Sequence, residues 1–175
     1  MTASVAPEPF RTRLVAFLPR LRRFCHGLCG DRDAGDDLLQ ATVERALTRH
    51  NQWEEGTSLE NWVFKMASNL NIDRLRAKKV RGISVEVEEA YDLPGEDMLA
   101  SLEFRSELEA ARAALAAMPA DLRTVMTTVV INGSSYREAA DMLDIPIGTV
   151  MSRVSRARQF VDAYVRRGPE RMAAA

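Results

Sequence analysis

Apolar residues recur every three or four positions between residues 10 and 79, which is the spacing of amphipathic α-helices. Gly30 and the polar loop 51–57 divide this stretch into three segments. Pro19 either opens or kinks the first segment, and Ser58 is placed to cap the third. The stripes predicted to be buried are Leu21, Phe24, Cys25 and Leu28 in the first segment, Leu39, Val43, Ala46 and Leu47 in the second, and Leu59, Trp62, Val63, Met66, Leu70 and Leu75 in the third.

The helical pattern stops between Val80 and Leu99. This stretch holds two glycines, a proline and six carboxylates, and we interpret it as an acidic linker. Residues 84–87 could form a short strand, although the sequence shows no partner for it.

Helical periodicity resumes over residues 100–118, and Pro119 opens a further helix. Ser135 is then placed to cap a short helix at 136–143, and a tight break leads to a longer helix at 147–165. Two short helices joined in this way predict a helix-turn-helix unit.

The last of these helices has two contrasting faces. Val150, Val154, Ala157 and Val161 form the stripe that we expect to be buried. Another face carries hydroxyls and guanidiniums without a carboxylate, namely Thr149, Ser152, Arg153 and Arg156. A helix that enters a major groove needs such donors and cations. The alternative is a packed helical hairpin with a basic, solvated face.

The turn before this helix departs from the common pattern, because Asp144 stands where glycine is frequent. Aspartate tolerates the left-handed backbone better than most residues, so a helix-turn-helix remains compatible with the sequence.

The composition is that of a globular, helix-rich chain, with 46% hydrophobic and 28% charged residues. Residues 1–80 carry a net charge of +3, residues 81–118 of −6 and residues 119–175 of +2. No window reaches the roughly 18–20 apolar residues of a membrane span, and the N-terminus lacks the pattern of a secretory signal. We therefore expect a cytoplasmic protein without membrane insertion.

Two cysteines, Cys25 and Cys29, flank His26 in the sequence CHGLC. Metal or redox chemistry is one reading, but the spacing is not CxxC and no second pair of ligands follows. We expect two small, buried, apolar side chains.

Three motifs, in this order, resemble those of bacterial sigma factors of the extracytoplasmic-function (ECF) group, and the resemblance covers residues 10–166. The first resembles the polymerase-binding helix of that family, with matches at Asp36, Asp37, Leu38, Gln40, Arg45 and Ala46. The second resembles its promoter-opening segment, with matches at Gly56, Trp62, Phe64, Ala67, Asn69, Asp73 and Arg76. The third, GTVMSRVSRAR, is close to the family form of the second domain. Departures are Ala41 for an acid, Val43 for Phe and Ser68 for Arg.

The resemblance implies an all-α fold with two small helical domains joined by a flexible linker. Residues 10–80 would bind core polymerase and the minus-ten element, residues 81–100 would form the linker, and residues 101–167 would form a four-helix, winged-helix-like domain for the minus-thirty-five element. The implied polymerase-binding residues are Asp36, Asp37, Leu38, Gln40 and Glu44. The implied minus-ten residues are Trp62, Asn69, Asp73, Arg74, Arg76, Lys78 and Lys79. The implied minus-thirty-five residues are Thr149, Ser152, Arg153, Ser155, Arg156 and Arg158, with Arg137 from the preceding helix.

Some of these residues have simpler readings. Trp62 could belong to the core, and the cations at the end of the third helix could only solvate its C-terminus, where they suit the helix dipole. Asp36 and Asp37 could be only first-turn acids.

The expected partners are core RNA polymerase, promoter DNA and an anti-sigma factor. No nucleophile–base pair, phosphate loop or metal cluster is visible, so we expect neither an enzyme nor a cofactor, and no small-molecule substrate. Two alternatives remain at this point. A stand-alone helix-turn-helix regulator would bind duplex DNA without polymerase, and a sigma-like decoy would titrate an anti-sigma factor.

Overall fold

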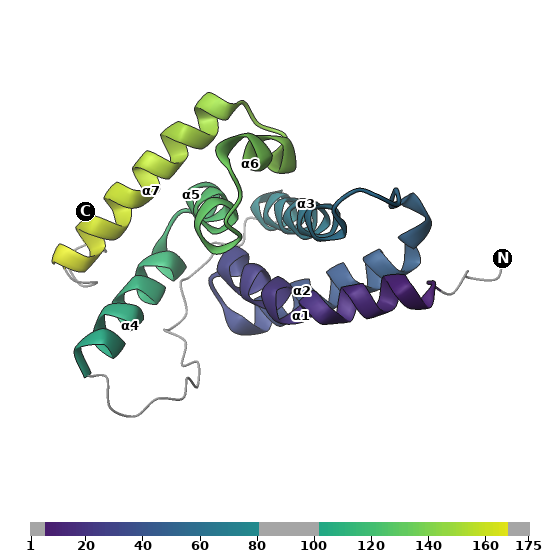
Figure 1. The fold of residues 1–175 in the computed structure, drawn as a ribbon. Helices are drawn as coiled ribbons and strands as arrows, with labels where there is room; N and C mark the ends of the chain where they lie inside the picture. The colour runs from purple at the N-terminus through teal and green to yellow at the C-terminus, as the bar shows by residue number, and fades with distance from the viewer. Residues whose placement is uncertain (1–5, 81–101, 168–175) are drawn as a thin grey trace.

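The computed structural model describes residues 6–80 and 102–167, which we call the N-terminal half and the C-terminal half. Both halves are built from α-helices, and the described residues contain no β-strand (Figure 1). The predicted all-α fold is therefore confirmed. The predicted linker, with its possible strand at 84–87, lies outside the described residues.

Three helices form the N-terminal half, and Gly30 and Ser58 mark helix ends as the sequence predicts. Gly30 ends the first helix in the left-handed conformation, with φ of 71°. The Ser58 hydroxyl caps the third helix by accepting a hydrogen bond from the Asn61 amide at 3.2 Å. Pro19 lies inside the first helix and does not open it. The helices are α1 (Glu8–Cys29), α2 (Arg32–Thr48) and α3 (Leu59–Val80), with a 3₁₀ turn at His50–Gln52.

The buried face of α2 differs from the predicted stripe. Leu38, Thr42 and Ala46 are at most 3% exposed, whereas Leu39 and Val43 are only partly buried. The reason is that α2 packs against both α1 and α3, so its buried face is centred between these two neighbours. Thr42 can occupy the centre because its hydroxyl donates to the Leu38 carbonyl at 2.7 Å.

The C-terminal half consists of two helices followed by the helix-turn-helix unit. Ser135 begins the short helix with a capping box: its hydroxyl accepts from the Glu138 amide, and the Glu138 carboxylate accepts from the Ser135 amide. Asp144 ends that helix in the left-handed conformation, with φ of 52°, as its place in the turn predicts. The helices are α4 (Leu102–Ala117), α5 (Ala120–Met126), α6 (Tyr136–Leu143) and α7 (Ile147–Arg167).

The helix predicted after Pro119 is only partly regular. It is α-helical to Met126, and Thr127–Ile131 then forms a π-helical turn. Thr124 and Thr128 each donate a hydroxyl hydrogen bond at 2.8 Å to the carbonyl four residues earlier. Such back-bonding competes with the backbone ladder and bends helices, so this threonine-rich segment is where a departure from α geometry is expected.

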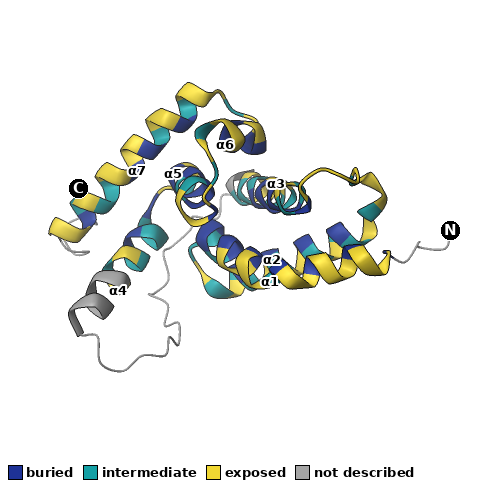
Figure 2. Cartoon of the chain, viewed as in Figure 1, coloured by how far each residue is buried: buried dark blue, intermediate teal, exposed yellow. Residues whose placement is uncertain are grey.

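The two halves pack directly against each other. α1 contacts α5 and the π-helical turn, and α3 contacts α6 (Figure 1). Met142 of α6 is 4% exposed and belongs to the core of the N-terminal half. Gly27 permits this approach, since a Cβ atom there would lie 2.8 Å from side-chain atoms of both Thr127 and Ile131. Figure 2 shows buried positions on α1, α3, α5 and α6, where the halves meet.

A buried arginine links the halves at the centre of this contact. Arg123 is 8% exposed, and its guanidinium donates from Nε to the Leu28 carbonyl at 3.2 Å and from Nη1 to the Ala116 carbonyl at 2.8 Å. Both carbonyls belong to the last turn of a helix, where intrahelical donors are lacking and the helix dipole is negative. Burial lowers the pKa of Arg123, and the two helix ends supply the negative potential that holds the cation.

Candidate nucleic-acid and polymerase interfaces

The exposed face of α7 carries most of the residues predicted to contact the minus-thirty-five element. Val150 and Val154 are buried, as predicted, and Val161 is half-buried. Thr149 is half-buried, whereas Ser152, Ser155, Arg156 and Arg158 are exposed on α7, and Arg137 is exposed on α6. The geometry therefore presents two hydroxyls and three guanidiniums to solvent next to the turn.

Arg153 is placed differently from the other α7 residues in this set. It is half-buried, and its Nε lies 3.5 Å from the Asp121 carboxylate of α5. The ion pair holds α7 against α5, so the guanidinium of Arg153 has a partner inside the protein.

Apart from Lys79, the predicted minus-ten residues on α3 are either exposed or half-buried. Asn69, Asp73 and Arg76 are exposed, and Arg76 lies 3.8 Å from the Asp73 carboxylate. Trp62 is half-buried and packs edge-on against Phe10, with ring centroids 6.3 Å apart. Arg74 and Lys78 are half-buried, and the Lys79 side chain lies outside the described residues.

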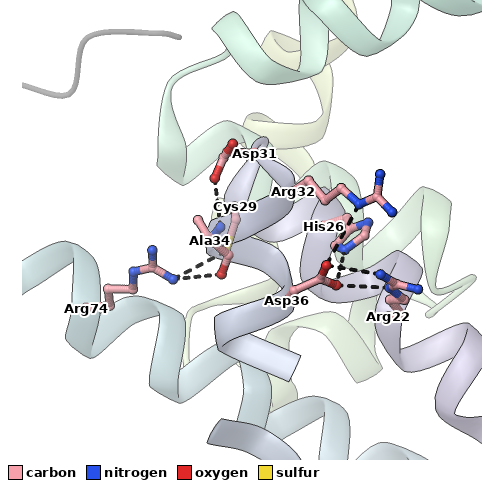
Figure 3. Close-up of polar contacts among 8 residues, drawn as sticks. All are labelled: Arg22, His26, Cys29, Asp31, Arg32, Ala34, Asp36 and Arg74. Atoms are coloured by element: carbon pink, nitrogen blue, oxygen red, sulfur yellow. Dashed lines mark hydrogen bonds and ion pairs between the residues drawn. The ribbon is translucent and has the colours of Figure 1, made fainter. Parts of the chain in front are cut away.

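Arg74 ties α3 to the start of α2 instead of extending into solvent. Its Nη1 donates to the Ala34 carbonyl at 2.8 Å (Figure 3). Arg74 and Lys78 also line a cavity of about 270 Å³ between α3 and the turn that joins α4 to α5. The other lining residues are Cys29, Ala34, Asn71, Leu75, Ala116, Ala117, Met118, Pro119, Ala120 and Arg123.

The predicted polymerase-binding residues lie on α2 and differ in exposure. Asp37, Gln40 and Glu44 are exposed, and Gln40 Nε2 donates to Glu44 Oε1 at 2.9 Å. Asp37 and Gln40 are therefore accessible to a partner on this face. Leu38 is 3% exposed and packs in the core, so its side chain supports the helix from inside.

Two arginines and a histidine hold the Asp36 carboxylate (Figure 3). Arg22 forms a two-point contact with the carboxylate, at 2.9 and 3.0 Å, and His26 Nε2 lies 2.8 Å from it. Arg32 lies 3.9 Å from the same carboxylate. The hydrogen bonds from Arg22 and then His26 lower the pKa of Asp36 to about 2, so the carboxylate is charged at neutral pH. These contacts brace α1 against α2 and fix the start of the face that carries Asp37.

The two cysteines are not bonded to each other. Cys25 is buried and Cys29 is half-buried, and both are free thiols. Burial raises the pKa of Cys25 to about 12 and that of Cys29 to about 11. Neither thiol is therefore ionised near neutral pH. The expected burial holds for Cys25, whereas Cys29 is only half-buried.

The described residues offer neither a metal-binding cluster nor a membrane-spanning helix. No group of three or more His, Cys, Asp or Glu residues within 6–80 and 102–167 is arranged to hold a metal ion. Within the same ranges no helix is long and apolar enough to cross a membrane.

These features define a helical DNA-binding protein with a capped helix-turn-helix and a separate helical half. The family description "Sigma2 domain of PhyR" matches residues 14–68, and "Sigma-70, region 4" matches residues 108–161. The ECF RNA polymerase sigma factor EcfG of Rhodopseudomonas palustris is 35% identical over 161 residues, which cover 90% of this chain and 86% of that protein. This chain therefore belongs to the ECF RNA polymerase sigma factor family.

Three further proteins are less similar in sequence. SigW, an ECF sigma factor of Bacillus subtilis, is 26% identical over 84% of this chain and 83% of its own length. The sigma factor RpoE of Bartonella quintana, solved with the anti-sigma factor NepR, has a TM-score of 0.75 and 28% identity, covering 93% of this chain and 99% of its own. CnrH, solved with the cytosolic domain of CnrY, shares the fold at a TM-score of 0.63 and 19% identity, covering 91% of this chain and 88% of its own.

Several residues that organise these surfaces do not stand out in the sequence. Arg123 and the pair formed by His26 and Asp36 act through contacts between different helices. The only local signal for Arg123 is a single charge within the segment LRTVMTTVV, whose other residues are apolar or threonine. A lone charge in such a segment indicates a buried cation with fixed partners.

Proposed function

We propose that this protein is a dissociable promoter-specificity subunit of bacterial RNA polymerase that acts by binding and catalyses no reaction. The N-terminal domain, residues 10–80, would bind core polymerase and the opened minus-ten element. The C-terminal domain, residues 101–167, would read the duplex minus-thirty-five element, with residues 81–100 as the linker. The observation that carries the proposal is the exposed face of α7, which has no carboxylate over residues 147–161 and follows the capped helix α6, in a chain whose family initiates transcription.

The exposed residues of α7 are the proposed readers of DNA. Arg156 and the hydroxyls of Ser152 and Ser155 would contact base edges, since arginine pairs with guanine and serine with several bases. Thr149, Arg158 and Arg137 would contact the phosphate backbone. Arg153 is half-buried against Asp121, so we propose that it positions α7 and contributes less to base reading.

On α3 the proposed contacts with the minus-ten strand come chiefly from its exposed side chains. Asn69 and Asp73 would hydrogen-bond to an unstacked base, and Arg76, Lys78 and Lys79 would contact phosphates. Trp62 would support the platform through its packing against the core, and Arg74 would hold α3 to α2.

On α2 we propose that Asp36, Asp37, Gln40 and Glu44 form the contact with core polymerase and that buried Leu38 supports the helix beneath them. The decisive variant is Asp37→Arg, because Asp37 is exposed. We expect co-purification with core polymerase to be lost while the helical circular dichroism and the melting temperature stay within error of the wild type. Glu60→Arg, on the half-exposed start of α3, is the control and should leave co-purification intact. Unfolding of Asp37→Arg, or full retention of polymerase, would contradict the assignment.

We also propose that an anti-sigma factor holds this protein inactive in the cytoplasm and competes with core polymerase. The support is that RpoE of Bartonella quintana was solved in complex with the anti-sigma factor NepR. We expect nanomolar binding, about −12 kcal/mol. A pull-down from unstressed cells with the full chain should recover a protein that is not a polymerase subunit. The proposal would be contradicted if the pull-down recovers polymerase subunits alone and if lysate of unstressed cells does not impair transcription in vitro.

A further inference from the structure

One large apolar side chain stands exposed on the proposed DNA-reading face. Met151 lies on the second turn of α7 and is 53% exposed, although its neighbours Val150 and Val154 are at most 1% exposed. Ser155 is one helical turn further on, so Met151 and Ser155 are neighbours on the helix surface. Ser152 follows Met151 directly and is also exposed.

The chain itself gives Met151 no packing role. It belongs to none of the three hydrophobic clusters of the described residues, which bury Val150, Val154 and Ala157 from the same helix. An exposed methionine of this size gains free energy only when a partner covers it. The nature of that partner is set by the charges that surround it.

The surroundings of Met151 favour nucleic acid as the partner. Exposed Arg156 and Arg158 lie on the same helix. Residues 147–161 include no carboxylate. In a major groove the only apolar group on a base edge is the C5 methyl of thymine, and apolar side-chain groups contact it.

Gly148 is consistent with a close approach of this helix to its partner. Its φ is not in the left-handed region, and a Cβ atom there would meet no other heavy atom within 4 Å. Neither backbone strain nor internal crowding therefore requires glycine at this position. The missing side chain leaves the start of α7 open on the side next to Met151 and Ser152.

We propose that Met151 is a specificity-determining residue of the minus-thirty-five contact and reads a thymine by covering its C5 methyl group. This inference rests on the proposed function of α7 as the DNA-reading helix. It adds an apolar contact to the polar contacts of Ser152, Ser155 and Arg156, so the preferred element must contain an A·T pair at the base step that Met151 reaches.

The test removes that methyl group from the DNA. The full chain with core polymerase first selects its minus-thirty-five element from a library of random duplexes. Each thymine of the selected element is then replaced singly by deoxyuridine, which lacks only the C5 methyl. We expect the wild type to lose about fourfold in affinity at one position, the value of one buried methyl-sized group.

The matching protein variants complete the cycle. Met151→Ala should bind the thymine duplex about fourfold more weakly and show no further loss with deoxyuridine at that position. Met151→Leu should still lose affinity when the thymine is replaced by deoxyuridine. Val165→Ala, at a residue 54% exposed on the far end of α7, is the control and should bind every duplex like the wild type. Exposure of Met151 makes misfolding of these variants easy to exclude by thermal melting.

The outcomes separate this inference from the proposed function. If Arg156→Ala loses affinity only for particular sequences and Met151→Ala is still fully sensitive to deoxyuridine, only the role of Met151 is overturned. Selection of an element without an A·T pair does the same. Loss of core-polymerase binding by Met151→Ala would assign the side chain to a protein contact and also overturn it. Failure to select any element, or an equal loss for Arg156→Ala on all sequences, would instead contradict the proposed function of α7.

Discussion

Replacement of Arg123 by methionine tests how the two halves are held together. The substitution keeps most of the side-chain volume and removes both hydrogen bonds, to the Leu28 carbonyl of α1 and to the Ala116 carbonyl of α4. Because Leu28 belongs to the other half, the variant loses a polar link between the halves as well as a cap on two helix ends.

The magnitude follows from two opposing terms. Hydrogen bonds to a charged group contribute about 1.5–3 kcal/mol each, net of their exchange with water, so the pair contributes about 3–6 kcal/mol apart from the cost of burying the cation itself. Arg123 is 8% exposed, and no carboxylate among the described residues is paired with it. Replacing this buried cation also removes its desolvation cost of several kcal/mol, so we expect the free energy of unfolding to fall by about 2 kcal/mol in total.

Urea unfolding of the full chain at neutral pH measures this change, and small-angle X-ray scattering reports whether the halves separate. We expect a lower midpoint for Arg123→Met and a larger radius of gyration before unfolding begins. Arg23→Met, at an exposed position of α1, should stay within about 0.5 kcal/mol of the wild type. An unchanged or higher stability of Arg123→Met, with an unchanged radius of gyration, would show that the hydrogen bonds do not exceed the desolvation cost.

Three further predictions concern single side chains. The pKa of Asp36 is lowered from 3.8 to about 2, so its contribution to stability is present above pH 3.8 and is lost as the pH falls through 2. The difference in free energy of unfolding between the wild type and Asp36→Asn, measured in urea, should therefore disappear over that range. A difference that stays constant with pH would contradict the ion cluster. Burial raises the pKa of Cys25 to about 12 and that of Cys29 to about 11, so few of the thiols of the folded protein are ionised at pH 8. We therefore expect the folded protein to react with a disulfide reagent at pH 8 about a hundredfold more slowly, or slower still, than the protein unfolded in urea. Similar rates for the folded and unfolded protein would refute this. Ser135→Ala removes the capping box of α6 and should cost about 1 kcal/mol by calorimetry; no change in melting temperature would mean that the cap is not used.

Local signals in the sequence are sufficient for the helices of this protein and for part of its candidate site. Gly30, Ser58 and Ser135 end or begin helices where their chemistry predicts, because caps depend only on residues within one turn. The buried stripe of α7 follows from periodicity alone, and so does the exposure of the serines on its other side. Asp144 adopts the left-handed conformation that the turn requires.

Contacts between distant segments account for what the sequence does not reveal. The position of α2 between two helices rotates its buried face toward Leu38, although the periodicity favoured Leu39 and Val43. Arg153 has the spacing of a DNA-facing residue, but Asp121, 32 positions earlier in the chain, pairs with it. The docking of the two halves through Arg123 likewise depends on groups 95 positions apart.

The central claim is that this chain gives core polymerase the ability to initiate at particular promoters. Run-off transcription with purified core polymerase, the full chain and fragmented genomic DNA tests it most directly. We predict a small set of discrete transcripts that require the chain and disappear with Asp37→Arg. We also predict a single shared upstream element among their start sites, whose minus-thirty-five part changes in strength with Arg156→Ala. Specific binding of the chain alone to duplex DNA, with no discrete transcript when core polymerase is added, would contradict the claim and indicate a stand-alone helix-turn-helix regulator.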